Sequence, residues 1–509
     1  MPSSYLSPGV YMEEVSSGSK PIEAVGTAVA AFVGFAEKGV PNEPILVTNW
    51  TQFTQNFGGF IPGSYLAHAV YQYFANGGGT CYVVRVGGDD VSSMPVLRAE
   101  LPAADDGKSS AFAVRALAPG NGKDGPISVE VVPGADPSDE TFSLVVKRGG
   151  QPVETIDGLT TKRGPSNVVT AVKQRSKLIE VEEVKGRQLA VPRKGTEVAL
   201  AESNPPAARI GADEYVGNAA DRTGFAGLEA VDEITMLAVP DVMAAYERGL
   251  IDAEGVRAVQ LAMITHCELM ADRVAIIDTP AGLNAQQVKA WRAEANYDSK
   301  YAAMYWPWLK VMDARTGSPM FMPPSGAMAG IWARNDATRG VHKAPANEVV
   351  RNAISLELNI TKGEHDQLNP DGINCIRSFP GQGIRVWGAR TLSSDPEWRY
   401  LNVRRLFNYV EKSILSGTNW VVFEPNDAKL WDSVRRTITM FLRRVWRDGA
   451  LFGATPSQAF FVKCDEENNP PENRDAGMLT VEIGIAPVKP AEFVIFRISQ
   501  YSDGAGLEE

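Results

Sequence analysis

The chain has 509 residues, of which 44% are hydrophobic and 22% are charged, a composition typical of folded globular proteins. At ~100 to 200 residues per domain, this length predicts several domains that each bury a core. Lys and Arg number 50 against 61 Asp and Glu, and the net charge of -11 argues against a general nucleic-acid coat, which needs a broad basic surface. No run reaches the ~18 apolar residues of a membrane helix. Met1–Val15 lacks the pattern of a signal peptide, so we expect assembly in the cytoplasm without membrane insertion.

The four cysteines are widely separated in the sequence and include no CxxC pair. That spacing indicates neither a disulfide framework nor a zinc site. We therefore expect four buried thiols, at Cys81, Cys267, Cys375 and Cys464.

The first 21 residues predict a strand that is joined to the body by a linker. Pro8 favours an extended backbone, and Val10–Val15 can form a short strand. Ser16–Pro21 is rich in Ser and is typical of a flexible linker. Such a strand has no evident local partner. A frayed tail is the alternative interpretation.

An α/β unit begins after this linker. Thr27–Phe35 and Cys81–Val86 are apolar runs with high β propensity, and Ile61–Asn76 between them predicts a helix.

A different pattern extends from about residue 91 to residue 215, where short β runs alternate with frequent Gly and Pro. Phe142–Val146 and Pro152–Ile156 flank Gly149 and Gly150, which predicts a hairpin. We expect a β-rich domain that is inserted into the α/β unit.

Strands that alternate with helices then predict a parallel sheet covered on both faces. Apolar residues at helical spacing indicate a helix over Glu254–Asp272; they are Val256, Val259, Met263, Cys267 and Met270. The other predicted elements are strands at Ile234–Val239, Val274–Ile277 and Tyr301–Met312, and a helix at Asn284–Asn296.

The pattern changes again after about Thr361. Strands are predicted near Asn374–Arg377 and Ile384–Trp387, and long helices over Tyr400–Ser416 and Asp427–Asp448. Leu479–Ile485 alternates apolar and polar residues and predicts a strand with one apolar face. After a linker at Ala486–Pro490, Phe493–Ile498 predicts a final strand that is apolar on both faces.

Residues that could carry chemistry are few. None of the four histidines has metal-ligand spacing with another, and His266 is expected to be a packed residue. Ser325 lies in no GxSxG elbow, so a hydrolase with a subtilisin-like core is only a weak alternative. The glycine clusters at 77–79 and 381–383 precede strands, and no GxxxxGK[ST] occurs, so phosphate binding is not indicated. Asp278 follows a strand but has no partner residue, and we expect no enzyme, no metal and no cofactor.

The helix Asp427–Asp448 carries a local concentration of positive charge in an acidic protein. Its cations lie mainly beside the apolar face, where arginines suit an acidic partner surface. They are Lys429, Arg435, Arg436, Arg443, Arg444 and Arg447. The alternative is a solvated helix surface whose cations pair with Asp432 and Asp448 of the same chain.

Six runs of sequence, taken together, are specific. They are Tyr5–Glu14 (YLSPGVYMEE), Thr27–Gly34, Ala36–Gly39, Asn76–Val86, Pro323–Gly330 and Trp387–Thr391. The chain resembles, over nearly its whole length, the tail sheath proteins of contractile phages, R-type bacteriocins and extracellular contractile injection systems.

The resemblance implies an α/β and α+β multidomain fold with a subtilisin-like βαβ core, a β-rich inserted domain, an α+β C-terminal domain and extended N- and C-terminal strand arms. Copies are expected to stack around an inner tube and to exchange these arms by adding strands to a neighbour's sheet. Head-to-tail contacts of that kind generate helical polymers, and contraction is a rigid-body change between two packings. No nucleotide site is evident, so energy is expected to be stored during assembly.

The resemblance also implies partners and boundaries. Further copies of the chain, an inner tube protein, and baseplate and terminal cap proteins are the expected partners, within a phage tail-like particle that can be released from the cell. The predicted divisions are 1–21 (arm and linker), 22–90 (first part of the core), 91–225 (inserted domain), 226–360 (core), 361–486 (C-terminal domain) and 487–509 (linker and arm). The arm residues expected between subunits are Val10, Tyr11, Met12, Val15, Phe493, Val494, Ile495, Phe496 and Ile498, and the six helix cations are expected to face the tube.

Two other classes remain as alternatives to a contractile sheath subunit, an enzyme and a surface-layer or adhesin protein. A catalytic constellation would favour the first and a secretion signal the second, and the sequence shows neither. A single chain with both arms argues against the two-protein sheath of type VI secretion. The sequence does not decide between a phage, a bacteriocin and an injection device.

Overall fold

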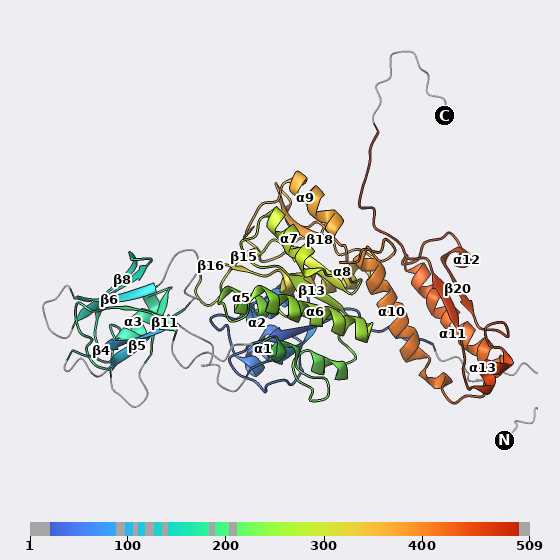
Figure 1. Cartoon of the computed structure of the whole chain (residues 1–509), viewed down its shortest axis with the longest axis horizontal. Coiled ribbons are helices and arrows are strands. Elements are labelled where there is room, and N and C mark those ends of the chain that lie inside the picture. Colours follow the sequence, from blue (N-terminus) through green and yellow to red (C-terminus); the bar gives the residue numbers. More distant parts are fainter. Residues whose placement is uncertain are drawn as a thin grey trace, which may run out of the picture. The chain divides into compact units, whose positions relative to one another are not determined.

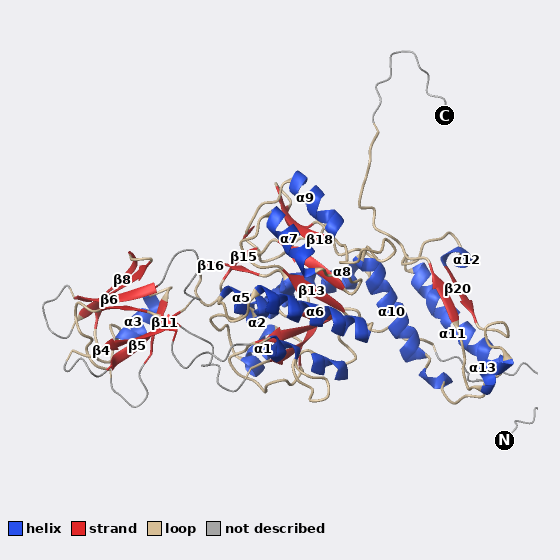
Figure 2. Ribbon diagram, viewed as in Figure 1, coloured by secondary structure: helices blue, strands red, loops and turns tan. Residues whose placement is uncertain are grey.

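The computed structural model describes residues 21–87, 97–104, 110–117, 127–134, 141–182, 189–202 and 211–497. The chain forms two compact units (Figures 1 and 2). The core unit comprises Gly26–Asn408 and Lys489–Glu509, and the C-terminal unit comprises Met1–Val25 and Tyr409–Val488. Helix α10 (Leu401–Gly417) runs through the division between them.

The core unit is built on an eight-stranded sheet with the order β19-β18-β14-β13-β12-β1-β3-β2. The six inner strands run parallel, and the strands at the two edges are antiparallel to their neighbours. The strands are β1 (Val29–Gly34), β2 (Ile45–Val47), β3 (Thr80–Arg85), β12 (Met236–Ala238), β13 (Val274–Asp278), β14 (Ala302–Trp306), β18 (Ile373–Phe379) and β19 (Gly383–Val386). Every residue of β13 and β14 is buried, because a parallel sheet is covered on both faces.

This sheet separates two hydrophobic clusters, one on each face, and both faces are covered by helices. They are α1 (Trp50–Phe57), α2 (Leu66–Ala75), α4 (Ala212–Val216), α5 (Asp241–Glu247), α6 (Ala253–Met270), α7 (Ala285–Ala295), α8 (Ser325–Arg339), α9 (Lys362–Leu368), and the 3-10 turns η2 (Ala226–Ala230) and η3 (Asn369–Asp371). The predicted helix over Glu254–Asp272 is confirmed as α6, and its Val256, Val259, Met263 and Cys267 are buried. The Asp252 side chain accepts a hydrogen bond from the Gly255 amide and so defines the start of α6.

One predicted strand, Tyr301–Met312, is wrong. The chain forms β14 and then β15 (Leu309–Met312), which belongs to a separate sheet with β16 (Pro319–Met322) and β17 (Ser355–Leu356). Pro307 lies between the two strands and has no N–H group to donate to a ladder, so one continuous strand cannot form there.

The strands near residues 374 and 384 also lie elsewhere than the sequence placed them. A C-terminal domain beginning at residue 361 would contain both, but β18 pairs with β14 in the main sheet and β19 follows it at the edge. Strand pairing over this distance leaves no local signal in the sequence, so only the fold shows it.

The segment between residues 97 and 202 contains two four-stranded sheets, β10-β6-β7-β8 and β11-β4-β5-β9, which share one hydrophobic core. The strands are β4 (Leu97–Pro102), β5 (Ser110–Ala116), β6 (Ile127–Pro133), β7 (Phe142–Arg148), β8 (Gln151–Leu159), β9 (Ile179–Glu182), β10 (Glu197–Ala199) and β11 (Ala201–Glu202), with helix α3 (Val168–Arg175). The predicted hairpin is confirmed, because β7 and β8 pair around Gly149 and Gly150, which both have positive φ.

The C-terminal unit contains the second half of α10, a long helix and a two-stranded sheet. Its elements are η4 (Asn419–Val421), α11 (Ala428–Arg447), α12 (Pro456–Ala459), β20 (Phe460–Lys463), α13 (Pro471–Asp475) and β21 (Glu482–Ile485). The two predicted helices are confirmed as α10 and α11. The strand predicted at Leu479–Ile485 is β21, and its partner β20 had not been predicted.

Two buried carboxylates in the core unit predict a dependence of its stability on pH. Burial raises the pKa of Asp278 to about 7, although its Oδ1 accepts a hydrogen bond from the Ser325 amide at 3.0 Å, and burial raises the pKa of Asp241 to about 6. A carboxyl with a raised folded-state pKa destabilises the fold when it is ionised. Its contribution to stability is therefore least favourable above pH 7 and improves as the pH falls toward the unfolded-state pKa of about 4.

Asp278→Asn is expected to raise the free energy of unfolding at pH 8 by on the order of 1 to 3 kcal/mol, because Asn keeps the acceptor and removes the charge. The difference between parent and variant should shrink between pH 8 and pH 5, measured by denaturant unfolding at both values. A difference that is the same at both would contradict the assignment of the effect to Asp278.

Helices α2 and α8 pack closely at Gly330. Adding side-chain volume there is therefore expected to lower the free energy of unfolding. A Cβ atom at Gly330 would lie 2.4 Å from the Tyr73 carbonyl oxygen. Gly330→Ala should therefore lower the free energy of unfolding by about 1 to 3 kcal/mol, despite the ~1 kcal/mol better helix propensity of Ala. The matched control is Gly363→Ala in α9, where a Cβ atom meets nothing within 4 Å and stability should be unchanged or slightly higher. Equal effects at the two glycines in thermal unfolding would refute the packing argument.

Candidate functional site

The long helix α11 separates apolar and basic residues onto different faces. The Asp427 side chain caps it by accepting a hydrogen bond from the Leu430 amide. One face is buried in the C-terminal unit; its residues are Leu430, Trp431, Val434, Thr437, Ile438, Phe441, Leu442 and Val445. All six predicted cations are exposed; they are Lys429, Arg435, Arg436, Arg443, Arg444 and Arg447.

Four of these cations form one line along the helix. Lys429, Arg436, Arg443 and Arg447 are 7, 7 and 4 residues apart, which at 3.6 residues per turn places them on the same face. We call these four residues the basic stripe. Arg435 and Arg444 lie to its two sides, so the structure divides the six predicted residues into a line of four and two flanking cations.

Ion pairing differs between the basic stripe and the flanking cation Arg435. Arg435 pairs with Asp432, as the alternative interpretation of this helix expected. None of the four stripe residues makes an ion pair with any part of the chain that the structure describes. A line of exposed cations without intramolecular partners is available to an acidic surface.

A second candidate is the small antiparallel sheet beside α11. Phe460 pairs with Ile485 and Val462 with Ile483, and β20 packs against α11. Phe461 is exposed on the other face, where its ring crosses Gly484 so closely that a Cβ atom there would lie 2.1 Å from it. Within the described ranges, neither β20 nor β21 pairs with a third strand. Both outer edges therefore present unpaired backbone groups that could accept an added strand.

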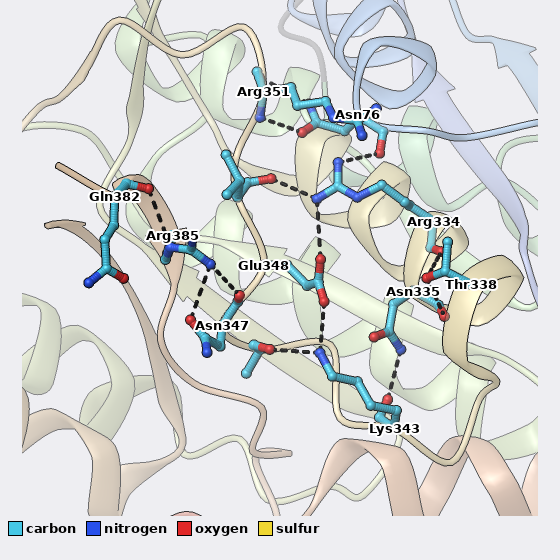
Figure 3. Close-up of polar contacts among 12 residues, drawn as sticks. Asn76, Arg334, Asn335, Thr338, Lys343, Asn347, Glu348, Arg351, Gln382 and Arg385 are labelled. Carbon is cyan, nitrogen blue, oxygen red and sulfur yellow. Dashed lines mark hydrogen bonds and ion pairs between the residues drawn. The ribbon is translucent and has the colours of Figure 1, made fainter.

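One edge of the main sheet is, by contrast, closed by the chain itself. The segment 347–350 runs beside β19, with hydrogen bonds from Asn347 N to Val386 O (2.7 Å) and from Val350 N to Ile384 O (2.9 Å). Figure 3 shows Glu348 between Lys343 and Arg334, at 2.8 and 3.6 Å. Such a held segment protects a sheet edge from pairing with another chain.

The C-terminal segment is anchored to the core unit through the side chain of Glu492. Glu492 accepts hydrogen bonds from Arg390 Nε (2.9 Å) and Nη2 (2.7 Å), from Asn369 Nδ2 (2.8 Å) and from Tyr400 Oη (3.1 Å). Burial opposes the charged form, but the bonds from Arg390 and Asn369 outweigh it and lower the Glu492 pKa. Bidentate pairing with Arg390 fixes both the position and the orientation of the Glu492 carboxylate.

The four residues that follow Glu492 are exposed apolar side chains. Phe493, Val494, Ile495 and Phe496 are each at least 67% exposed. The prediction of a strand over Phe493–Ile498 is wrong for the single chain, because residues 493–497 form no strand and Ile498 lies outside the described residues. A strand needs the backbone of a partner to form a ladder, and residues 493–497 pair with no other strand among the described residues. We call residues 493–509 the C-terminal arm.

The N-terminal arm can be located only by its base. Val10, Tyr11, Met12 and Val15 lie outside the described residues. Ile22 is buried against the backbone of Gly417 at the end of α10, and the Val25 amide donates to Ser413 Oγ at 3.2 Å. Ile22 and Val25 therefore lie beside the last turns of α10.

The residues that could have carried catalysis are placed unfavourably for it. Ser325 is fully buried, and its hydroxyl has no hydrogen-bond partner among the described residues. Burial lowers the pKa of His266 to about 4, with the nearby Arg273 acting in the same direction. The four cysteines are buried and free, as expected. In the described ranges, no group of three or more His, Cys, Asp or Glu side chains could hold a metal ion, and no helix is long and apolar enough to cross a membrane.

Two family models match adjacent parts of the chain. The phage tail sheath protein central domain matches residues 222–392, and the phage tail sheath C-terminal domain matches residues 393–500. Together they cover more than half of the 509 residues.

Curated relatives and solved structures agree with these models. Tail sheath proteins of Salmonella phage ViI and Burkholderia phage BcepMu are each 28% identical, over 40% and 44% of this chain. The aligned parts span only 32% and 49% of those relatives. The contracted sheath of an extracellular contractile injection system, PVC, has a TM-score of 0.58 at 23% identity, covering 98% of this chain and 99% of that one. The contracted helical sheath of the anti-feeding prophage has a TM-score of 0.60 at 24% identity, covering 97% and 99%. The fold is thus the mixed α/β multidomain fold of contractile sheath proteins, and the chain belongs to the phage tail sheath protein family.

Proposed function

We propose that this chain is a structural sheath subunit that polymerises helically around an inner tube and contracts to drive the tube into a target. The observation that carries the proposal is the C-terminal arm, whose four consecutive apolar side chains are exposed beyond an anchored Glu492. Exposing such a segment in a single chain is costly, at roughly 25 cal/mol for each Å² of apolar surface that a partner could bury. Another copy is the partner that a sheath supplies.

Strand addition is the mode of contact that the chain favours. The open edges of β20 and β21 offer unpaired amides and carbonyls, and an arm that is apolar on both faces can pack one face inward and cover exposed apolar side chains such as Phe461 with the other. The arms of one copy would thus complete the small sheet of the next. Contacts of this kind need not close on themselves and so produce a helical polymer.

Glu492 gives the arm a mechanical attachment to the core unit. Four side-chain hydrogen bonds hold it, so a pull on the arm is transmitted to Arg390 and from there to β18 through the bond between Arg390 N and Asn374 Oδ1 at 2.7 Å. Contraction would be a rigid-body rearrangement of subunits whose arms stay paired.

The basic stripe is proposed to face the inner tube. Its cations match an acidic partner surface, and each contact is individually weak because exposed ion pairs contribute only ~0 to 1 kcal/mol. Repetition along a polymer gives the interaction its strength. The flanking Arg435 already has Asp432 as its partner and contributes least to this surface.

The remaining details are proposed with the function. The parallel sheet with helices on both faces is consistent with a subtilisin-like topology, used here as a scaffold without catalysis. Assembly in the cytoplasm as part of a phage tail-like particle, with baseplate and terminal cap proteins at the ends, is expected.

Removal of the C-terminal arm tests the role of strand addition. Deleting Phe493–Glu509 while keeping Glu492 should leave the melting temperature of the dispersed chain unchanged, because residues 493–497, the part of the arm that the structure describes, are exposed. Long sheaths should not form, as seen by negative-stain microscopy. Deletion of Met1–Val15 should have the same effect. Sheaths of normal length from either truncation would rule out arm exchange.

Charge reversal tests the basic stripe. Arg436→Glu with Arg443→Glu and Arg447→Glu should weaken co-assembly with the inner tube protein and leave the stability of the dispersed chain within about 1 kcal/mol of the parent. The matched control replaces the same three residues by Lys, which keeps the charge and should co-assemble nearly as the parent does. Co-sedimentation at low and high salt measures both variants. Unaltered tube binding by the triple Glu variant would count against a tube-facing role.

A further inference from the structure

The connection between α10 and α11 contains a turn whose sequence conflicts with its backbone. The Glu424 amide donates to the Val421 carbonyl at 3.1 Å, which closes a four-residue turn with Val422 and Phe423 at its centre. Val422 has φ -65° and ψ 129°, and Phe423 has φ 69°. These angles define a type II turn, in which the third residue normally is Gly because it needs positive φ. We call residues Val421–Glu424 the apolar turn.

The side chains at the centre of the apolar turn face solvent. Phe423 is fully exposed, Val422 is 64% exposed, and Leu415 in the last turns of α10 is 70% exposed. A bulky residue at positive φ is strained, and here the strain is not compensated by any burial of the ring. The dispersed chain gains nothing evident from Phe423, whereas Gly would suit the backbone better. A position that breaks a local rule without stabilising its own fold indicates a role outside that fold.

The base of the N-terminal arm lies next to this turn. Ile22 packs on Gly417, which directly precedes the connection, and Val25 bonds to Ser413 one turn earlier. Ile22 therefore lies at the end of α10, four residues before the apolar turn begins. The linker Ser16–Pro21 spans at most ~3.6 Å per residue, so a neighbouring copy that pairs with Val10–Val15 lies within about 22 Å of this base.

We infer that the apolar turn is a contact between copies of this chain, in which Phe423 and Val422 insert into an apolar pocket of the neighbouring copy. The inference rests on the proposed function, since the neighbour that takes the arm supplies the pocket. An aromatic ring that is already held in one backbone conformation loses little entropy on docking, so the strained turn presents the ring in advance. The turn adds a side-chain contact that is separate from strand addition by the arms.

Phe423→Gly distinguishes a contact between copies from a contribution to the chain's own fold, because it removes the ring and relieves the strain at positive φ. The melting temperature of the dispersed full-length chain should stay the same or rise. The concentration needed for half-assembly, measured by sedimentation velocity on the purified chain, should rise about tenfold or more. Phe423→Leu should recover part of the loss, because it restores an apolar side chain.

Thiol accessibility gives an independent readout that keeps Phe423 in place. The four native cysteines are buried, so an introduced cysteine can be labelled with little background. Val422→Cys should react with iodoacetamide in the dispersed chain and be protected in the polymer. Val153→Cys, in β8 at a position that is 55% exposed, is the matched control and should react equally in both states.

Each other outcome overturns the inference. Normal assembly by Phe423→Gly, or a Val422→Cys thiol that stays reactive in the polymer, would show that the turn is not a contact. A fall in the melting temperature of the dispersed Phe423→Gly chain would show that the ring stabilises its own fold. A parent chain that forms no polymer at any concentration, either alone or with the inner tube protein, would reject the proposed function and the neighbouring pocket together.

Discussion

Backbone hydrogen bonding is the constraint on which the organisation of this chain depends. Each amide and carbonyl that leaves water needs a partner, and the core unit meets this need internally with six parallel strands and antiparallel edges. At one edge the segment 347–350 is held beside β19 by the charges of Arg334, Lys343 and Glu348. Among the described residues, the outer edges of β20 and β21 pair with no further strand, and residues 493–497 of the C-terminal arm are exposed and form no strand.

The two kinds of edge differ in what they can accept. The edge at β19 is covered by the chain itself, whereas an open edge such as those of β20 and β21 can accept a strand of another copy. Glu492 attaches the C-terminal arm, which is proposed to pair with another copy, to the core unit by a bidentate contact with Arg390. A subunit lattice that changes its packing without coming apart requires such a combination of rigid bodies and retained links.

Buried ionisable groups in the core unit serve the fold. Asp241 accepts hydrogen bonds from Ser64 and from the amides of Phe35 and Leu66, and so joins the end of β1 to the start of α2. Asp278 holds the first amide of α8. Both lie near the carboxyl ends of parallel strands, where α/β enzymes place catalytic residues, but here their hydrogen bonds are made to the chain itself. The side chains at these positions, Asp241 and Asp278, therefore hold neighbouring elements of the fold together.

The sequence by itself determined the features that depend on neighbouring residues. Helical spacing predicted α6, α10 and α11, the Gly149-Gly150 pair predicted the β7–β8 hairpin, and the concentration of cations on α11 was evident from residue type and position. Features that depend on distant residues were decided only by the tertiary structure. The membership of β18 and β19 in the main sheet, the pairing of β20 with β21 and the lack of any strand in residues 493–497 all follow from which backbone lies alongside, and no local pattern encodes that. The strain at Phe423 was hidden for the same reason, since a residue's type does not reveal its φ until the turn around it has formed.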